Sequence, residues 1–310
     1  MNSEKIERKF SCPNNAHLEI SNIRGSVKIQ PGEKGVISVS AVLHKNSGDG
    51  EHTWIEIAQG DDESVKVKTH YDHNGFHLFH NRLPCKVDYE IIVPSECNLV
   101  INGVSNKTSV AGISGSIGIS TVSGKVDCQS LGDQLSLKSV SGDIFGENLS
   151  GIAKIKTVSG DVSLKKCEFR KISGKTVSGD LITENLIGQG PFEFNSVSGD
   201  IHLGIHSSKG ANISFSTISG GMLTSMPFTE VERTRNLRRI IIADGEADIS
   251  FSSISGDIRI MGGEKENASL AHPEKQHIED LTVDGVTILQ KIESGELTVD
   301  QALQIMSEKN

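Results

Sequence analysis

A Ser-Gly-Asp tripeptide recurs along the sequence, and serine and aspartate are residue types that can carry chemistry. SVSGDI occupies residues 139–144 and returns at 196–201, with close variants such as TVSGDV at 157–162 and SISGDI at 253–258. A serine nucleophile needs a base within hydrogen-bond reach, and no histidine stands in a fixed relation to these serines. Catalysis requires one special place, whereas these units repeat, so the motif predicts architecture.

The aspartates of these units are the first candidates for a ligand surface. Stacked carboxylates repel one another unless a cation lies between them, so a column of them could bind Ca²⁺ or a cationic ligand. Lys125, Lys175 and Gly221 interrupt the series, and an Asp after Gly commonly caps its own turn. We therefore expect turn capping as their main role. The candidates are Asp143, Asp161, Asp180, Asp200 and Asp257.

The segment HYDHNGFHLFH (residues 70–80) holds four histidines, which could attract Zn²⁺ or Ni²⁺. Asn-Gly at its centre predicts a two-residue hairpin turn, and that register spreads the histidines over two faces. Four ligands then do not converge. A three-ligand site of His70, Asp72 and His77 is the metal hypothesis that this register leaves.

The segment ERTRNLRR (residues 232–239) carries four arginines that could contact an acidic protein or lipid headgroups. It lies in a double interval of the repeat, so we expect a loop or irregular rung in a basic insertion near 224–245. Solvated charges that balance an acidic chain are the expected interpretation. The candidate contacts are Arg233, Arg235, Arg238 and Arg239.

The spacing of the units predicts the architecture. The glycines of successive units lie 18, 18, 19, 20 and 21 residues apart, from Gly124 to Gly220, and a further step of 36 reaches Gly256. A period near 20 residues is typical of a solenoid in which each repeat stacks on its neighbours. The short alternating segments between glycines favour strands. We expect an all-β parallel β-solenoid with rungs of roughly 20 residues.

Within each unit, the apolar residues four positions apart should share the inner face of an extended chain. Val140 with Ile144 and Ile254 with Ile258 are two such pairs. The glycine between them would allow a corner or a positive φ. Ser, Thr and Asp should then form ladders on the outer surface.

The reiterated [ST]-[VI]-S-G-[DK]-[VIL] units, preceded by VDYEIIVP (87–94) and LVINGVS (99–105), resemble a bacterial family. It is the β-strand-repeat "putative adhesin" family, a domain of otherwise unknown function. The resemblance covers roughly residues 15–262. It implies a parallel β-solenoid and no established catalytic residues.

The two ends depart from the regular period. Residues 1–105 of the solenoid (1–262) should form irregular rungs or a β cap, with strands in GVISVSAVL, HTWIEIAQ and SVKVKTHY, and residues 106–262 the regular rungs. HLEISNIRGSVKIQPG (17–32) should form one irregular rung. The polar stretch 263–280 has the composition of a linker.

Residues 281–310 have the spacing of a short helical hairpin. Gly295 would end the first helix, and Thr298 with Gln301 forms a capping pattern for the second. The pattern resembles the SHOCT-type C-terminal modules, which implies docking or oligomerisation. About 30 residues cannot bury a sufficient core alone. The apolar stripe would meet the solenoid, another copy or a protein partner through Ile288, Leu289, Ile292, Leu303 and Met306.

Composition limits the classes of function. Forty acidic against 31 basic residues give a net charge of −9, which argues against nucleic acid as a partner. The five cysteines are scattered without a C-x-x-C pair, so free thiols are expected. No apolar stretch could span a membrane or serve as a secretory signal, so we expect a cytoplasmic protein.

These patterns favour a non-enzymatic scaffold without a cofactor, whose C-terminal hairpin docks or oligomerises it. The first alternative is a module that binds a cation or a cationic ligand through the aspartates. The second is a carbohydrate-active β-helix enzyme, which would need carboxylates that converge in a cleft.

Overall fold

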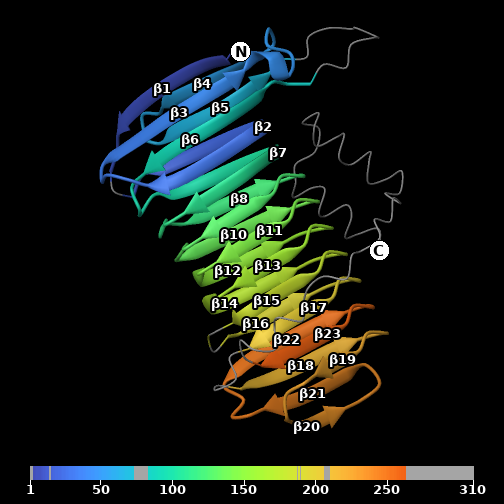
Figure 1. Ribbon diagram of the computed structural model, residues 1–310. Coiled ribbons are helices and arrows are strands. Elements are labelled where there is room, and N and C mark those ends of the chain that lie inside the picture. Colours follow the sequence, from blue (N-terminus) through green and yellow to red (C-terminus); the bar gives the residue numbers. More distant parts are fainter. Residues whose placement is uncertain are drawn as a thin grey trace, which may run out of the picture. The chain divides into compact units, whose positions relative to one another are not determined.

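The computed structural model describes residues 3–262, with the exception of 14, 73–82, 187, 189 and 206–209. Apart from one short 3₁₀ helix, the regular secondary structure of these residues is β-strand (Figure 1). The chain divides into two compact units, with the boundary between Leu137 and Lys138. The predicted linker and helical hairpin lie outside the described residues.

Unit 1 contains nine strands and one short 3₁₀ helix in its described part. β10 (Gln134–Ser139) crosses the boundary between the units. The other elements are β1 (Ser3–Ser11), β2 (His17–Pro31), β3 (Val36–His44), η1 (Lys45–Ser47), β4 (Thr53–Gln59), β5 (Val65–Tyr71), β6 (Lys86–Val93), β7 (Asn98–Ala111), β8 (Ile117–Thr121) and β9 (Val126–Gln129).

Two long strands of unit 1, β2 and β7, run parallel and take part in both of its faces. Their first halves belong to the order β4-β5-β2-β7-β8, and their second halves to β1-β3-β6-β2-β7-β9. The pairs β1/β3, β3/β6 and β4/β5 are antiparallel. Strands β3, β4 and β5 confirm the alternating segments predicted from sequence, and β2 is one continuous strand across the predicted irregular rung.

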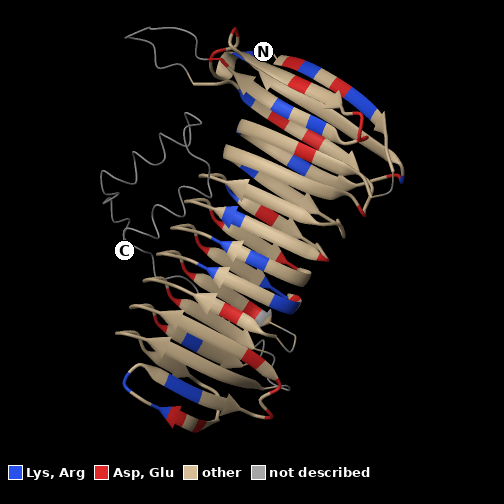
Figure 2. Ribbon diagram, turned by 180° about the vertical axis from the view of Figure 1, so that it is seen from behind, with Lys and Arg blue, Asp and Glu red and all other residues tan. Residues whose placement is uncertain are grey.

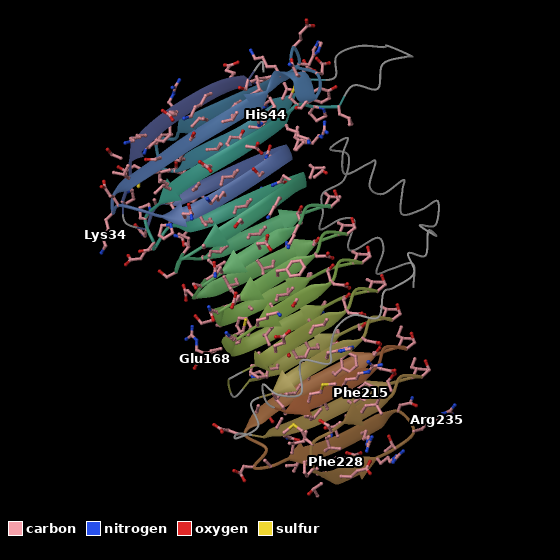
Figure 3. The ribbon with its side chains drawn as sticks, in the orientation of Figure 1. Lys34, His44, Glu168, Phe215, Phe228 and Arg235 are labelled. Carbon is pink, nitrogen blue, oxygen red and sulfur yellow. The ribbon has the colours of Figure 1, made fainter. Side chains whose placement is uncertain are left out.

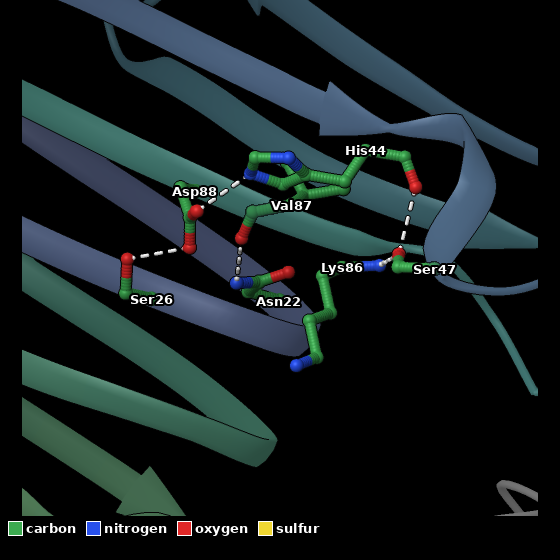
Figure 4. Close-up of polar contacts among 7 residues, drawn as sticks. All are labelled: Asn22, Ser26, His44, Ser47, Lys86, Val87 and Asp88. Carbon is green, nitrogen blue, oxygen red and sulfur yellow. Dashed lines mark hydrogen bonds and ion pairs between the residues drawn. The ribbon is translucent and has the colours of Figure 1, made fainter. Parts of the chain in front are cut away.

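A buried polar network fixes the corner where β2 turns from one face to the other. Asn22 donates from Nδ2 to the carbonyl of Val87 at 3.0 Å (Figure 4). Its Oδ1 accepts from the hydroxyl of Thr69, which also lies 2.7 Å from the hydroxyl of Tyr89. Burial raises the pKa of Tyr89 to about 12. Buried polar groups of this kind are stable only when each finds a partner, so the network specifies the position of the corner.

A second set of contacts in Figure 4 joins the outer side of the same corner region. The carboxylate of Asp88 accepts from Ser26 Oγ at 2.7 Å and lies 2.7 Å from Nε2 of His44. Ser47 bridges β3 and β6, because its hydroxyl donates to the His44 carbonyl and accepts from the Lys86 amide. These bonds hold η1 against the end of β3 and the start of β6.

Unit 2 begins with short strands that recur at regular intervals. Its described strands after β10 are β11 (Ile144–Glu147), β12 (Ser150–Lys156), β13 (Val162–Lys165), β14 (Glu168–Lys175), β15 (Leu181–Leu186), β16 (Phe192–Asn195), β17 (Ile201–Ile205), β18 (Ala211–Thr217), β19 (Met222–Thr224), β20 (Phe228–Arg233), β21 (Leu237–Ile242), β22 (Ala247–Ser253) and β23 (Ile258–Gly262).

The repeats of unit 2 stack in parallel, as the period predicts. Ile144 pairs with Val162, Val162 with Leu181 and Leu181 with Ile201, so equivalent residues of neighbouring units lie side by side. The two faces follow the orders β11-β13-β15-β17 and β12-β14-β16. A mostly parallel all-β architecture is therefore confirmed.

The rung formed by β22 and β23 comes last in the sequence, but it is not the last rung of the stack in space. β22 lies between β16 and β18, and β23 lies between β17 and β19. The chain thus forms β18 and β19 first, passes through β20 and β21, and then returns to fill the gap. The predicted simple succession of rungs is wrong at this step, because a 36-residue interval contains both an excursion and an inserted rung.

The excursion is an antiparallel hairpin that covers the outer edge of β18. β21 pairs antiparallel with β18, and β20 pairs antiparallel with β21 (Figure 1). The basic insertion, for which the sequence predicts a loop or an irregular rung, is therefore an antiparallel pair of strands. β20 has a register shift near Val231, a bulge of the kind that discourages further strand pairing at an edge.

The core of unit 2 consists of ladders of identical or similar apolar side chains. Ile144, Val162, Leu181, Ile201 and Ile258 are each at most 2% exposed. On the other face, Phe251 stands beside Phe194 in one neighbouring strand and beside Phe215 in the other. The rings of Phe215 and Phe251 stack, with their centroids 5.2 Å apart. Few aromatic residues are needed because equivalent side chains fill equivalent spaces in successive rungs.

The residues that the structure describes include no helix long and apolar enough to cross a bilayer.

Replacing Gly179 by alanine should destabilise unit 2. A Cβ atom there would overlap the carbonyl oxygen of Gly160 in the neighbouring rung, and this oxygen belongs to the backbone, which cannot move aside as a flexible side chain can. We expect a loss of about 1–3 kcal/mol, seen as a lower urea midpoint by circular dichroism. Gly221→Ala is the matched control, because its nearest neighbour would be an Asp257 carboxylate oxygen at 3.4 Å. An equal loss in both variants would contradict this interpretation.

Candidate functional site

The candidate site is the corner formed by the repeated hexapeptide, whose positions we number 1 to 6. Position 1 is Ser or Thr, and it is buried: Ser139, Thr157 and Thr176 are 0%, 3% and 7% exposed. Its hydroxyl bonds across the corner to the glycine at position 4, for example Thr157 Oγ1 to the Gly160 carbonyl at 2.9 Å. The predicted outer ladder of these hydroxyls is wrong, because they close the corner from inside.

The apolar residue at position 2 does not follow the predicted inner face in every rung. Val140 and Val158 are buried, but Ile254 is 44% and Ile218 71% exposed. The alternation of an extended chain fails here because the backbone turns between positions 2 and 6. Position 6 stays in the core in every unit except 217–222, where Met222 is half-buried.

The serine at position 3 connects neighbouring rungs through its backbone and its side chain. Ser178 donates its amide to the carbonyl of Val158 at 2.8 Å, and its hydroxyl lies 3.4 Å from the same oxygen. Ser159 and Ser198 make the same pair of contacts one rung away on either side. The amide and the hydroxyl of each of these serines therefore contact the neighbouring rung.

The glycine at position 4 is required for close approach between rungs. A Cβ at Gly160, Gly179 or Gly199 would overlap the carbonyl of the glycine in the adjacent rung. None of these three has a positive φ, so the predicted alternative of a left-handed corner is wrong. The absence of a side chain, rather than unusual backbone geometry, is what the corner needs.

The aspartate at position 5 binds the next rung rather than its own turn. Asp143 accepts from the amide of Asp161 at 3.0 Å, and Asp161 accepts from the amide of Asp180 at 2.8 Å. Asp180, Asp200 and Asp257 continue the series, which ends where Asp257 accepts from the amide of Gly221. The expected capping of its own turn is therefore replaced by a clamp between rungs.

The structure accounts for the three residues that interrupt this series in the sequence. Lys125 occupies position 5 of the unit at 121–126, one unit before the first of the five aspartates. Gly221 belongs to the last rung of this face, where no further amide needs a carboxylate. Lys175 lies on β14, outside any corner. The five aspartates thus form one uninterrupted column, and Figure 2 shows acidic residues recurring along this edge of unit 2.

The column leaves part of its charge available. Each of these hydrogen bonds uses Oδ1, and no ion pair among the described residues involves Asp143, Asp161, Asp200 or Asp257. Neighbouring rungs of a sheet are about 4.8 Å apart, so the carboxylates form a closely spaced row. Closely spaced carboxylates repel one another, and a cation between them would relieve this repulsion.

The arginines of the β20–β21 hairpin are mostly neutralised by nearby glutamates. Arg238 lies 3.0 Å from Glu230, and its guanidinium stands 5.2 Å from the Phe228 ring. Arg239 pairs with Glu232 at 3.1 Å, and Arg233 lies 3.9 Å from Glu230. Arg235 sits in the turn and makes no ion pair within the described residues (Figure 3).

The histidine segment is described only at its beginning, so His77 and the rest of the turn lie outside the described residues. His70 Nε2 lies 2.6 Å from Glu56, and Asp72 donates its amide to the His52 carbonyl. No group of three possible metal ligands occurs among the residues that the structure describes. The apolar stripe candidates Ile288, Leu289, Ile292, Leu303 and Met306 also lie outside them.

The sequence patterns did not identify one exposed aromatic residue of unit 1, Trp54. Trp54 is 46% exposed and stacks on His70, with ring centroids 5.1 Å apart and planes within 4°. The signal was present in HTWIEIAQ, because alternation places Trp54 and Glu56 on the face opposite Ile55 and Ile57.

The cysteines are free and mostly buried. Burial raises the pKa of Cys97 to about 12 and that of Cys167 to about 11. A reactive cysteine needs a lowered pKa, so these two have a structural character.

Comparison with known proteins gives a family. The family described as Toastrack DUF4097 matches residues 15–261. None of the curated proteins matches the chain.

The solved structures that match this chain include proteins from several bacteria. A "putative lipid binding protein" from Parabacteroides distasonis has 15% identity and a TM-score of 0.48, covering 84% of this chain and 96% of its own. A "putative adhesin" from Bacteroides fragilis has 14% identity and a TM-score of 0.40, covering 83% and 97%. A "putative cell adhesion protein" from Clostridium sporogenes has 12% identity and a TM-score of 0.25, covering 84% and 100%.

Asp161→Ala and Asp161→Asn should separate the structural role of the column from its charge. Alanine leaves the Asp180 amide without its acceptor, at a cost of about 1 kcal/mol, whereas asparagine keeps an oxygen in place. We expect a lower urea midpoint for the alanine variant and a midpoint near the parent for the asparagine variant. Equal destabilisation by both would mean that the charge, and not the acceptor, holds the rungs.

Proposed function

The chain belongs to the Toastrack DUF4097 family, and we propose that it is a non-enzymatic scaffold that presents a regular polar surface to a protein partner. In this proposal residues 281–310 dock or oligomerise the scaffold. The observation that supports a non-enzymatic role is the hexapeptide corner. Its hydroxyl, amide and carboxylate groups form hydrogen bonds within the stack, so the repeated motif serves the architecture.

The repetition of one corner in successive rungs supports binding over catalysis. An active site needs a nucleophile, a base and a stabilising group that converge on one place. Here the same residues occur in the same roles in successive rungs, and the carboxylates run in a row. A carbohydrate-active enzyme would need two carboxylates on opposite sides of a sugar bond, and a row does not supply that geometry.

The C-terminal part of the proposal rests on the pattern of residues 281–310. Their apolar residues have helical spacing, and about 30 residues need another surface to bury them. The described chain ends at Gly262 on β23, and the 18 residues 263–280 separate this segment from β23 in the sequence. A tether of that length gives a high effective concentration for any contact shared with the stack or a common partner.

Truncation before residue 281 should change the assembly state of the protein. We expect light scattering to give a lower oligomeric mass for the truncated chain, or chemical crosslinking to lose a partner that the full chain captures. A full-length variant with Ile292→Asp and Leu303→Asp should behave in the same way, because charges would interrupt the apolar stripe. The matched control is Gln290→Asp with Gln304→Asp, which adds the same charge at polar positions.

Unchanged mass and unchanged crosslinks in both the truncated and the Ile292→Asp, Leu303→Asp proteins would refute a docking role for the segment.

A second candidate function is favoured by the column of carboxylates. Five aspartates in a row, each with one oxygen bound to a backbone amide, form a negative strip that could bind Ca²⁺ or a cationic peptide. This function would use the same corners and would need no catalytic group.

Calorimetry with Ca²⁺ and with an oligolysine peptide tests this second function. We expect heat of binding from the parent protein and a loss of about tenfold in affinity for Asp161→Asn with Asp180→Asn, which preserves the acceptor oxygens. Glu193→Gln with Asp244→Asn makes the same change in charge away from the column and should leave affinity unchanged. No heat from the parent, or equal losses in both double variants, would exclude a site on the column.

A further inference from the structure

Unit 1 exposes a large aromatic surface at the edge of one of its faces. Trp54 lies on β4, the first strand in the order β4-β5-β2-β7-β8, and is 46% exposed. It is the single tryptophan of the chain. Its side chain is not needed for the core, because Ile55 and Ile57 occupy the inward positions of the same strand.

The orientation of the indole is fixed by its neighbours. His70 stands opposite Trp54 on β5 and stacks on it almost in parallel. The imidazole is held in turn by Glu56, whose carboxylate lies 2.6 Å from Nε2. One face of the indole is therefore supported, and the exposed remainder is presented in a fixed orientation. A preordered aromatic surface loses little conformational entropy when a ligand stacks on it.

A row of polar residues leads away from this aromatic pair across the sheet. The pairing register places one residue of each strand side by side, and all of them are exposed or half-buried. Five strands at about 4.8 Å spacing give a track of about 19 Å. The row consists of Glu56, Lys68, Ser21, Asn102 and Ser120.

We propose that this surface, Trp54 with His70 and the row from Glu56 to Ser120, is a binding site for an oligosaccharide. A sugar ring offers an apolar C–H face to an aromatic ring and hydroxyl groups at its rim. The C–H face can stack on the aromatic pair, and the hydroxyl groups can hydrogen-bond to the row, which contains both donors and acceptors. The length of the row suits a chain of sugars better than a single ring.

The charges beside the indole distinguish a sugar from a cation as the ligand. Cation–π binding at Trp54 would favour a quaternary ammonium group, which needs a negative or neutral rim. Lys68 is exposed directly opposite Glu56, and Glu56 is already bound to His70. The rim is therefore of mixed sign, which disfavours a cation and suits neutral hydroxyl groups.

This site is independent of both functions proposed above. It lies on β4, β5, β2, β7 and β8 of unit 1, whereas those proposals rest on the corners with the aspartate column and on residues 281–310. Failure of one proposal would therefore leave the other in place.

Intrinsic fluorescence of the full chain tests the site directly, because its single tryptophan is the proposed contact. The probes are cellotetraose, chitotetraose and maltotetraose, each titrated to about millimolar concentration, with choline as the cationic probe. We expect a saturable change in tryptophan emission with at least one tetrasaccharide and none with choline. Saturation by choline alone would overturn the choice of ligand, and no change with any tetrasaccharide would overturn the site.

Variants then locate the binding by calorimetry. Trp54→Ala should weaken tetrasaccharide affinity by about tenfold or more, and Lys68→Ala or Asn102→Ala by several-fold. Ile92→Ala, which removes another exposed apolar side chain of unit 1 from β6, should bind as the parent does. Circular dichroism would show that each variant is folded. Equal affinity of folded Trp54→Ala and the parent would refute the proposal.

Discussion

The structure of unit 2 depends on one hydrogen bond that a regular sheet would not contain. At each corner the amide of position 5 has no carbonyl opposite to it, and the aspartate of the preceding rung accepts it instead. The glycine at position 4 allows this because backbones approach each other there without a Cβ between them. Serine and threonine at position 1 close the inner side of the same corner. Three of the six positions of the repeat, 1, 4 and 5, are therefore explained by the need to pair every polar group at a bend.

Much of this fold follows from the period of the sequence, and some of it does not. The stacking of Ile144, Val162, Leu181 and Ile201 is predicted by their spacing, since parallel rungs align equivalent residues. The burial of Thr157 and the exposure of Ile254 are not, because alternation assumes an extended chain and the corner is bent. The insertion of β22 and β23 could not be predicted either, since a double interval in sequence gives no order in space.

The candidate sites divide in the same way. The aspartates were identified as a column from their spacing, but their bond to the next rung depends on which amides the corner leaves unpaired. The arginines of the hairpin were visible as a basic segment, while their partners Glu230 and Glu232 became neighbours only through strand pairing. Trp54 stood in a strand whose alternation already placed it outside, although its stacking on His70 required the β4–β5 register.

The inserted rung also sets an order of events during synthesis. The ribosome makes β18 and β19 before β22 and β23, yet the later pair must separate the earlier pair from β16 and β17. The earlier strands therefore cannot adopt their final neighbours until about 40 further residues have emerged, in contrast to the rungs before them, which can add one by one. The edge of this stack in space is therefore formed by β19 and the β20–β21 hairpin, and not by the strands that come last in the described chain.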